Sequence, residues 1–313
     1  AGGPRQGRQG GAPIETATRR FAALAAPAKL NLSLRVLGRR PDGYHELETL
    51  FERIDLADEL TFEPRADGIT VTCDDPTLNC GPENLVTQAA RLLQQACRIT
   101  EGAAIRLTKR IPIAGGLGGG SSDAATKLIG LNQLWQLGLS QARLQEFGAR
   151  LGSDVPFFLQ EAAFAIGRGR GERCEPLTGA IPTLWHVLVA PDKRLSTKEI
   201  YEAFDRQESV LTEPRASLTM CLHALRNGPD LAGLAKGLVN DLEPEAIRRC
   251  PVIRDLQYAL RAAGCLGVLV SGSGPSVFGV CRDAAQAQHA AQMVRQDSPP
   301  AWRIFVVKTA ETL

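Results

Sequence analysis

A run of small residues between positions 115 and 122 has the composition of a binding site for a phosphate chain. Glycines stand at 115, 116, 118, 119 and 120, and Ser121 and Ser122 follow. Without a Cβ, glycine lets the backbone approach a ligand closely, and the first turn of a helix offers unpaired N–H groups to an anion. The run contains neither GxxxxGK[ST] nor GxGxxG, which excludes a Walker loop and a dinucleotide fingerprint. A flexible turn capped by serine or aspartate is the simpler alternative.

Two further stretches hold groups that move protons and charge. Lys29 and Asn31 stand two positions apart in the alternating segment 26–36, so an ammonium and an amide project from one face of a strand. Asp154 is the only carboxylate in the otherwise apolar stretch 152–159. Both have structural alternatives, a solvated sheet face for the strand and a helix N-cap for an aspartate before Val-Pro. The pattern alone leaves these alternatives open.

These groups need a scaffold of strands and helices to bring them together. The spacing of Ala124, Leu128, Leu131 and Trp135 predicts a helix directly after the glycine run. The rest of the pattern predicts an α+β protein. Its elements are a strand at 26–36, a turn and second strand within 39–51, strands at 60–64, 69–73 and 103–111, helices at 83–96 and 140–151, a strand at 181–191, helices at 240–250 and 251–264, a strand hairpin at 266–280, and a last helix and strand.

A Gly- and Arg-rich stretch of low periodicity, residues 161–180, marks a change in the chain. We place a domain boundary at its end, which predicts an N-terminal domain at 24–180 and a C-terminal domain at 181–313. Residues 1–23 are rich in Gly and Arg and have no apolar segment. They are expected to form a disordered extension rather than a secretory signal.

Composition excludes several functional classes. Lys and Arg number 36 against 34 Asp and Glu, and this balance gives no electrostatic reason to expect nucleic acid or a membrane surface as partner. No apolar run reaches the roughly 18 to 20 residues that span a bilayer. The 8 cysteines form no CxxC pair and no zinc-like cluster with the 4 histidines. We expect a cytoplasmic protein whose cysteines are mostly small buried hydrophobes.

Three segments together resemble the motifs of the GHMP kinases, in family order. APAKLNLSL at 26–34 is similar to motif 1, IPIAGGLGGGSSDAA at 111–125 to motif 2, and the SGSGPS loop at 271–276 to motif 3. GSDVPFF at 152–158 also resembles a family segment, with serine in place of the usual alanine at 153. The resemblance spans roughly residues 24 to 310. Ala114 departs from it, because the family usually has glycine there.

The resemblance implies roles for individual residues. Lys29 and Asp154 match the catalytic positions. Asn31, Tyr44, His45 and Tyr201 match substrate-binding positions, where Tyr44 stacks on a cytosine, His45 hydrogen-bonds its edge and Tyr201 is a second facing aromatic. Stacking with edge hydrogen bonds is how proteins read an unpaired base. The ATP-binding set is Asn84 and Lys109 by the adenine, together with Pro112, Ile113, Ala114, Gly115, Gly116, Leu117, Gly118, Gly119, Gly120, Ser121, Ser122, Gly272, Ser273 and Gly274.

The resemblance also implies a fold and an activity. The fold would be an N-terminal domain like domain 2 of ribosomal protein S5 and a ferredoxin-like C-terminal domain, with the active site between them. The activity would be phosphorylation of a cytidine-diphosphate-linked methylerythritol by ATP, with Mg²⁺ held mainly by the nucleotide phosphates, no protein metal ligands, and a monomer or homodimer as the assembly. A mevalonate- or homoserine-type kinase, and a catalytically silent ligand sensor, are the alternatives.

Overall fold

The computed structural model describes residues 23–81, 84–206, 217–226, 228 and 230–310. The predicted N-terminal extension lies outside these residues, except for Ala23. The predicted strands and helices are confirmed within the described part of the chain, with shifts of a few residues at their ends. The strands predicted separately within 39–51 and at 60–64 are the two ends of one long strand, which begins at His45.

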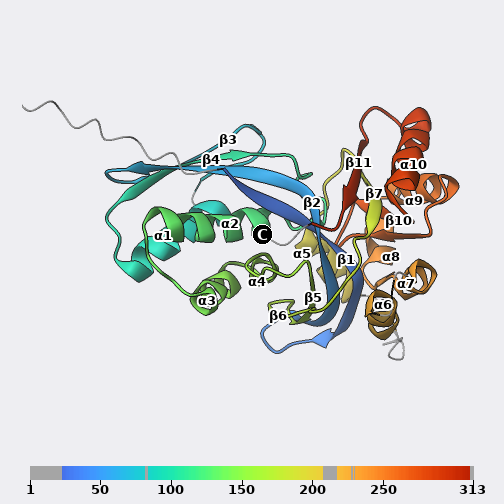
Figure 1. Cartoon of the computed structure of the whole chain (residues 1–313), viewed down its shortest axis with the longest axis horizontal. Helices are drawn as coiled ribbons and strands as arrows, with labels where there is room; N and C mark the ends of the chain where they lie inside the picture. The colour runs from blue at the N-terminus through green and yellow to red at the C-terminus, as the bar shows by residue number, and fades with distance from the viewer. Residues whose placement is uncertain (1–22, 82–83, 207–216, 227, 229, 311–313) are drawn as a thin grey trace, which may run out of the picture.

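A seven-stranded sheet forms the larger half of the molecule (Figure 1). Its path is β3-β4-β2-β1-β8, with β5 also paired to β2 and β6 to β5. The strands are β1 (Leu24–Arg39), β2 (His45–Arg65), β3 (Ile69–Cys73), β4 (Gly102–Thr108), β5 (Phe164–Gly169), β6 (Arg173–Pro176) and β8 (Val239–Asn240). Because β8 comes from the second half of the chain and pairs in parallel with β1, the two halves share this sheet.

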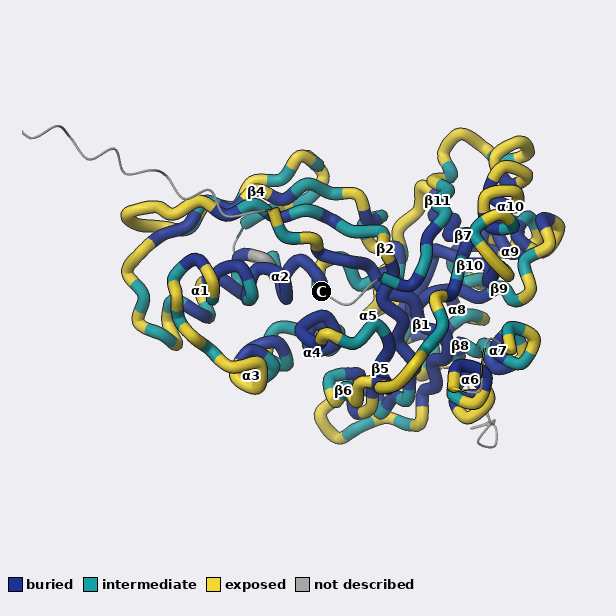
Figure 2. Tube along the Cα trace, viewed as in Figure 1, coloured by how far each residue is buried: buried dark blue, intermediate teal, exposed yellow. Residues whose placement is uncertain are grey.

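Helices cover one side of this sheet at the end formed by β3 and β4 (Figure 1). They are α1 (Leu85–Cys97), α2 (Gly119–Leu134), α3 (Gln141–Leu151) and α4 (Val155–Phe158). The central one, α2, is buried along most of its length (Figure 2). Its Gly130 faces the ring of Phe62 so closely that an added Cβ would lie 2.4 Å from the ring. The glycine thus lets α2 rest directly on the sheet.

A four-stranded antiparallel sheet forms the second half, in the order β11-β7-β10-β9. Its strands are β7 (Trp185–Ala190), β9 (Gly267–Val270), β10 (Val277–Cys281) and β11 (Arg303–Lys308). The remaining helices are α5 (Thr197–Phe204), α6 (Ser217–Arg226), α7 (Leu231–Gly237), α8 (Glu243–Arg249), α9 (Val252–Ala262) and α10 (Ala284–Asp297). The order of the strands in this sheet, with crossover helices between them, is the split βαβ arrangement of ferredoxin-like domains.

The two sheets meet in a continuous apolar core. Leu30 and Leu32 of β1 pack in the same cluster as Leu188, Phe278 and Val280 of the second sheet. The same junction holds a wholly buried polar group, in which Glu52 accepts from His186 at 2.9 Å and from the Thr309 hydroxyl at 2.7 Å. The boundary near residue 180 stays a prediction, because both β8 and this apolar core join the parts of the chain on its two sides.

The polar face of β1 is not a solvated sheet face. Lys29, Asn31, Ser33 and Arg35 are all at most 7% exposed. The apolar face of the strand packs in one cluster with the second sheet, and the polar face contacts the glycine loop, α6 and the residue that follows β8. Burying charged and amide groups costs free energy unless they are hydrogen-bonded, so this face must be paired within the protein or serve a ligand.

Candidate active site

An open cleft of about 860 Å³ lies where the two halves meet. Its walls are the glycine loop and the start of α2, parts of strands β1 and β2, helix α5 and the loop after β9. Of the predicted site residues, the structure brings these to the cleft: Lys29, Asn31, Tyr44, His45, Asn84, Lys109, Tyr201, Asp154, Gly272, Ser273 and all of residues 112–121. One cavity therefore joins segments that are far apart in the sequence.

Lys29 lies at the centre of this cleft and connects three parts of it. Its Nζ donates to Asn31 Oδ1 at 2.5 Å and to the Gly116 carbonyl at 3.0 Å, and lies 3.7 Å from Asp154 Oδ2. Asn31 in turn donates to the Thr49 hydroxyl at 2.8 Å, so its amide is engaged at both ends and orients the lysine. Burial lowers the pKa of Lys29, and the neighbouring Asp154 carboxylate opposes that shift.

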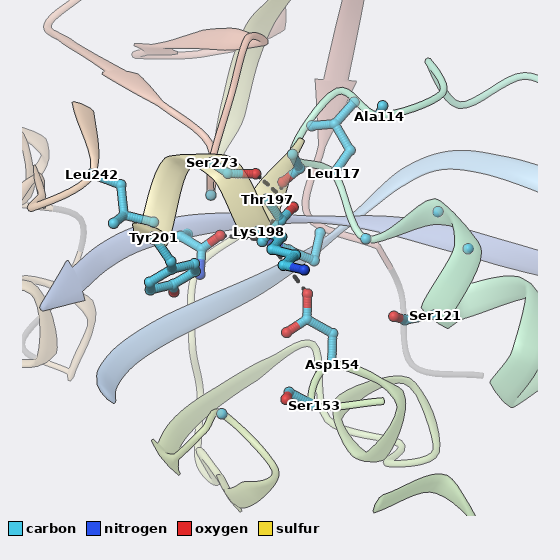
Figure 3. Close-up of a pocket in the computed structure, with 18 of the residues that line it drawn as sticks. Ala114, Leu117, Ser121, Ser153, Asp154, Thr197, Lys198, Tyr201, Leu242 and Ser273 are labelled. Atoms are coloured by element: carbon cyan, nitrogen blue, oxygen red, sulfur yellow. Dashed lines mark hydrogen bonds and ion pairs between the residues drawn. The ribbon is translucent and has the colours of Figure 1, made fainter. Parts of the chain in front are cut away.

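Asp154 occupies the N-cap position of α4, yet its carboxylate makes no capping hydrogen bond to the described backbone. The side chain is 31% exposed and points across the cleft, toward the wall that carries Thr197 and Tyr201 (Figure 3). The alternative of a purely structural helix cap is therefore wrong, because the group that would cap faces Lys29 instead.

A residue that the sequence did not single out, Arg53, anchors the segment behind Asp154. Its wholly buried guanidinium donates to the carbonyls of Phe157 and Gln160, at the end of α4. Burial lowers the pKa of Arg53 to about 10. A cation at a helix C-terminus satisfies carbonyls that have no partner within the helix. Arg53 thereby fixes the short helix that carries the aspartate, and no local motif around it signals this.

The glycine loop has the geometry of an anion site at a helix N-terminus. Gly118 is the N-cap of α2 with a left-handed φ of 70°, and no side chain of the described residues caps the helix. The N–H groups of its first turn are thus directed at the cleft without an intrahelical partner. At Gly116, with φ 79°, an added Cβ would lie 2.1 Å from the Ser271 carbonyl oxygen. Only glycine lets this loop and the loop after β9 cross so closely.

Three residues of the predicted ATP-binding set either do not line the cleft or have an unusual backbone conformation. Ser122 is fully buried in the first turns of α2 and Gly274 packs toward Val270 and Ala246, so neither lines the cleft. Both expectations came from the resemblance to motifs 2 and 3, which does not reveal which way a residue faces. Ala114 does line the cleft but has a left-handed φ of 54°. A methyl group makes that conformation cost about 1–2 kcal/mol, and glycine would avoid the cost.

Lys109 has strong partners inside the protein. Its Nζ bridges Asp58 and Asp123, 2.9 Å from the latter. Burial alone would lower the pKa of Lys109, but the two carboxylates raise it. Burial raises the pKa of Asp123 to about 7. This network fixes the segment that directly follows β4. No pattern in the sequence links the two aspartates to Lys109.

The far end of the cleft is aromatic. Tyr44 is 53% exposed, and the Arg170 guanidinium lies over its ring at 4.7 Å. His45 stacks on Tyr201 with ring centroids 4.8 Å apart. The imidazole also bonds through Nε2 to Asp205 at 2.6 Å. Asp205 is a further cleft residue that sequence reasoning missed, because it follows α5 in an ordinary exposed pattern.

The site combines a carboxylate, a buried ammonium beside it and an adjacent anion site. These are the groups that suit the transfer of a phosphoryl group to a hydroxyl. The fold and the site thus define a small-molecule phosphotransferase. The comparisons with known proteins agree. The chain matches the model described as GHMP kinases N terminal domain over residues 84–161 and the model described as GHMP kinases C terminal over residues 221–299.

Individual relatives narrow the family. The 4-diphosphocytidyl-2-C-methyl-D-erythritol kinase of Pelotomaculum thermopropionicum is 45% identical, over 91% of this chain and 96% of its own length. A protein of the same name from Symbiobacterium thermophilum is 43% identical, over 90% and 97%. A crystal structure of 4-(cytidine 5'-diphospho)-2C-methyl-D-erythritol kinase matches with a TM-score of 0.76 at 38% identity, over 92% of this chain and 98% of that one. The chain belongs to the 4-diphosphocytidyl-2-C-methyl-D-erythritol kinase family within the GHMP kinases.

More distant structures share the fold. A homoserine kinase from Cytophaga hutchinsonii has a TM-score of 0.74 at 20% identity, covering 96% of this chain and 98% of its own. The predicted two-domain GHMP kinase fold and the predicted enzyme class, a kinase, are confirmed. Among the described residues, no helix is both long and apolar enough to cross a membrane.

Proposed function

We propose that this protein transfers the γ-phosphoryl group of ATP to the 2-hydroxyl of 4-(cytidine 5'-diphospho)-2-C-methyl-D-erythritol, a step of the non-mevalonate route to isoprenoid precursors. The observation that carries the chemistry is the 3.7 Å approach of Lys29 Nζ to Asp154 Oδ2 beside the glycine loop. The choice of substrate rests on the named relatives, because their similarity to this chain extends over nearly its whole length. All 8 cysteines are thiols, which agrees with a reducing cytoplasm.

Asp154 accepts the proton of the attacking hydroxyl. Lys29 keeps positive charge next to the developing alkoxide and the γ-phosphoryl oxygens, where negative charge spreads in the transition state. Because Lys29 also donates to the Gly116 carbonyl, the group that steadies the charge is tied to the loop that holds the phosphates. Asn31 orients the lysine, and the first turn of α2 holds the triphosphate.

Mg²⁺ fits this site as a companion of the nucleotide. Within the described residues, no group of three or more His, Cys, Asp or Glu side chains is arranged to hold a metal. The residues that line the cleft include oxygen donors near the glycine loop, among them the Ser121 hydroxyl and the Asp154 carboxylate. Mg²⁺ favours oxygen ligands and commonly takes them from substrate phosphates and water. When bound, it neutralises charge on the phosphates.

Turnover with a panel of acceptors tests the function. ADP release from ATP is measured with the cytidylated methylerythritol, with mevalonate and with homoserine, under identical conditions. We expect turnover with the first acceptor alone. Preferred turnover of mevalonate or homoserine would assign the chain to another substrate, and binding of the cytidylated compound without turnover would make the protein a ligand sensor.

Gly118→Val is expected to weaken ATP binding by about tenfold or more, since a left-handed φ costs a side chain about 1–2 kcal/mol and a β-branched one more. The new Cβ would also lie 3.0 Å from Lys29 Cγ and 3.0 Å from Phe158 Cζ. Calorimetric titration of ATP and of the cytidylated substrate, each alone, measures the effect. Equal weakening of both ligands would indicate general misfolding instead of a damaged phosphate loop.

Tyr44→Ala is expected to weaken the cytidylated substrate by about 5- to 150-fold, because one base–aromatic contact contributes about 1–3 kcal/mol. Tyr44→Phe, which keeps the ring, should retain most of the affinity. The KM for ATP should hardly change, because Tyr44 lies at the aromatic end of the cleft. KM values for both substrates in the two variants provide the check, and an unchanged KM for the cytidylated substrate in Tyr44→Ala would contradict the stacking role.

A further inference from the structure

A hydrogen bond between the two halves of the chain holds the histidine at the aromatic end of the cleft. His45, at the start of β2, bonds through Nε2 to Asp205 Oδ1 at 2.6 Å, although 160 positions separate the residues. Asp205 lies at the C-cap of α5, one turn after Tyr201, which stacks on the imidazole at an interplanar angle of 26°. One ring face and one ring nitrogen of His45 are therefore fixed by a single helix. All three residues line the cleft.

The partner determines which nitrogen of His45 carries the proton. An ionised carboxylate only accepts hydrogen bonds, so Nε2 must donate, and in a neutral imidazole Nδ1 is then left with a bare lone pair. Nδ1 has no hydrogen-bond partner among the described residues. The ring thus presents an acceptor, and it needs a ligand that presents a donor.

We propose that Asp205 is a positioning residue that makes this kinase selective for cytosine over uracil, by holding His45 in the tautomer whose Nδ1 accepts from the 4-amino group of the base. This inference rests on the proposed function. Cytosine carries an amino donor at C4, whereas uracil carries a carbonyl acceptor there. A uridine analogue would place its oxygen against the Nδ1 lone pair and leave both acceptors without a donor, which costs free energy because the bound base keeps water from them.

A purely structural role for Asp205 is the competing explanation. Its other oxygen, Oδ2, lies 3.8 Å from Arg39 Nε at the edge of the cleft. If Asp205 only held Arg39 or docked α5 against β2, its loss would affect cytidine and uridine substrates alike. The ratio of the two specificities therefore separates the explanations, whereas the activity with a single substrate does not.

The test compares kcat/KM for the cytidine substrate and its uridine analogue in wild type, Asp205→Asn and Glu199→Gln. It is run at about pH 8, above the usual range of histidine titration. The amide that Asp205→Asn introduces can donate to Nε2 and so permits the opposite tautomer, in which Nδ1 is a donor. We expect the cytidine-to-uridine ratio to fall by about 10- to 100-fold in Asp205→Asn, the loss of one matched polar contact. Glu199→Gln makes the same chemical change on the same helix, where Glu199 pairs with Arg249, and should leave the ratio as in wild type.

Two further measurements complete the design. In a His45→Ala background, Asp205→Asn should not change the ratio further, because the two residues act as one unit. Imidazole ¹⁵N shifts of ligand-free wild type should show His45 protonated at Nε2, and Asp205→Asn should show the other tautomer. An equal loss for both substrates, an unchanged ratio, or a wild-type imidazole protonated at Nδ1 alone would overturn the proposal. Wild type that turns over neither nucleotide substrate would refute the proposed function, while the ¹⁵N shifts would still report on the tautomer.

Discussion

Asp154→Asn is expected to lower kcat by about 10²- to 10⁴-fold while the protein still binds both substrates. The amide has nearly the same shape as the carboxylate but cannot accept the proton of the attacking hydroxyl. The fold should tolerate the change, because the Asp154 side chain does not cap α4 and Arg53 holds that helix from its other end. Steady-state turnover together with calorimetric titration of each ligand measures the effect.

The control for this substitution is Asp192→Asn, the same change at an exposed position outside the cleft lining. It should turn over like wild type. A near-normal kcat in Asp154→Asn would remove the residue from the chemistry and return it to the role of a helix N-terminus. A lost kcat combined with lost binding of both ligands would point to a collapsed cleft.

Lys29→Met should also cost about 10²- to 10³-fold in kcat, the usual loss when a preorganised charge in a catalytic site is removed. Unlike the aspartate variant, it should raise the KM for ATP as well. The Lys29 side chain donates to the Gly116 carbonyl, so its loss leaves the phosphate loop joined to residue 29 of β1 through the backbone bond to the Leu117 carbonyl but without this second contact. Methionine fills similar space at this position, which is 4% exposed, and so limits the effect of an empty cavity. Kinetics with varied ATP at saturating acceptor give both constants.

Lys193→Met serves as the matched control, since Lys193 is exposed and does not line the cleft. The double variant Lys29→Met/Asp154→Asn should be little worse than the more severe single variant, because residues that act as one unit are not additive. If the losses of kcat in the two single variants multiplied fully in the double variant, lysine and aspartate would act independently. An unchanged KM for ATP in Lys29→Met would contradict the link between Lys29 and the phosphate loop.

The sequence predicted the parts of this site that are short and local. The glycine run followed by helical spacing predicted the loop and α2. Both the backbone freedom of glycine and the period of an amphipathic helix can be recognised from residues that are neighbours in the sequence. The alternation from 26 to 36 likewise predicted a strand with a polar face. Its burial was not predictable, since it depends on β8 and the second sheet, which come from elements about 150 or more positions away.

The contacts that tune the site were not predictable for the same reason. Arg53 reaches α4, Asp205 reaches His45, and Lys109 is held by Asp58 and Asp123, each through a contact set by the tertiary fold. Single polar residues on strands and at helix ends look like ordinary surface groups in a sequence. Ser122 illustrates the opposite error, because its position in the motif suggested a ligand contact while the helix turns it into the core.

The position of the new phosphate on the product tests the central claim most directly. The 2-carbon of the acceptor carries a methyl group and no hydrogen, so a phosphate on its oxygen has no proton three bonds away. Proton-coupled ³¹P NMR of the reaction of ATP with the cytidylated methylerythritol should therefore show one new phosphomonoester resonance that is not split, with the cytidine diphosphate bridge intact and one ADP formed per product. A resonance split by CH or CH₂ protons, an extended phosphate chain, or inorganic phosphate as the only new species would contradict transfer to the 2-hydroxyl.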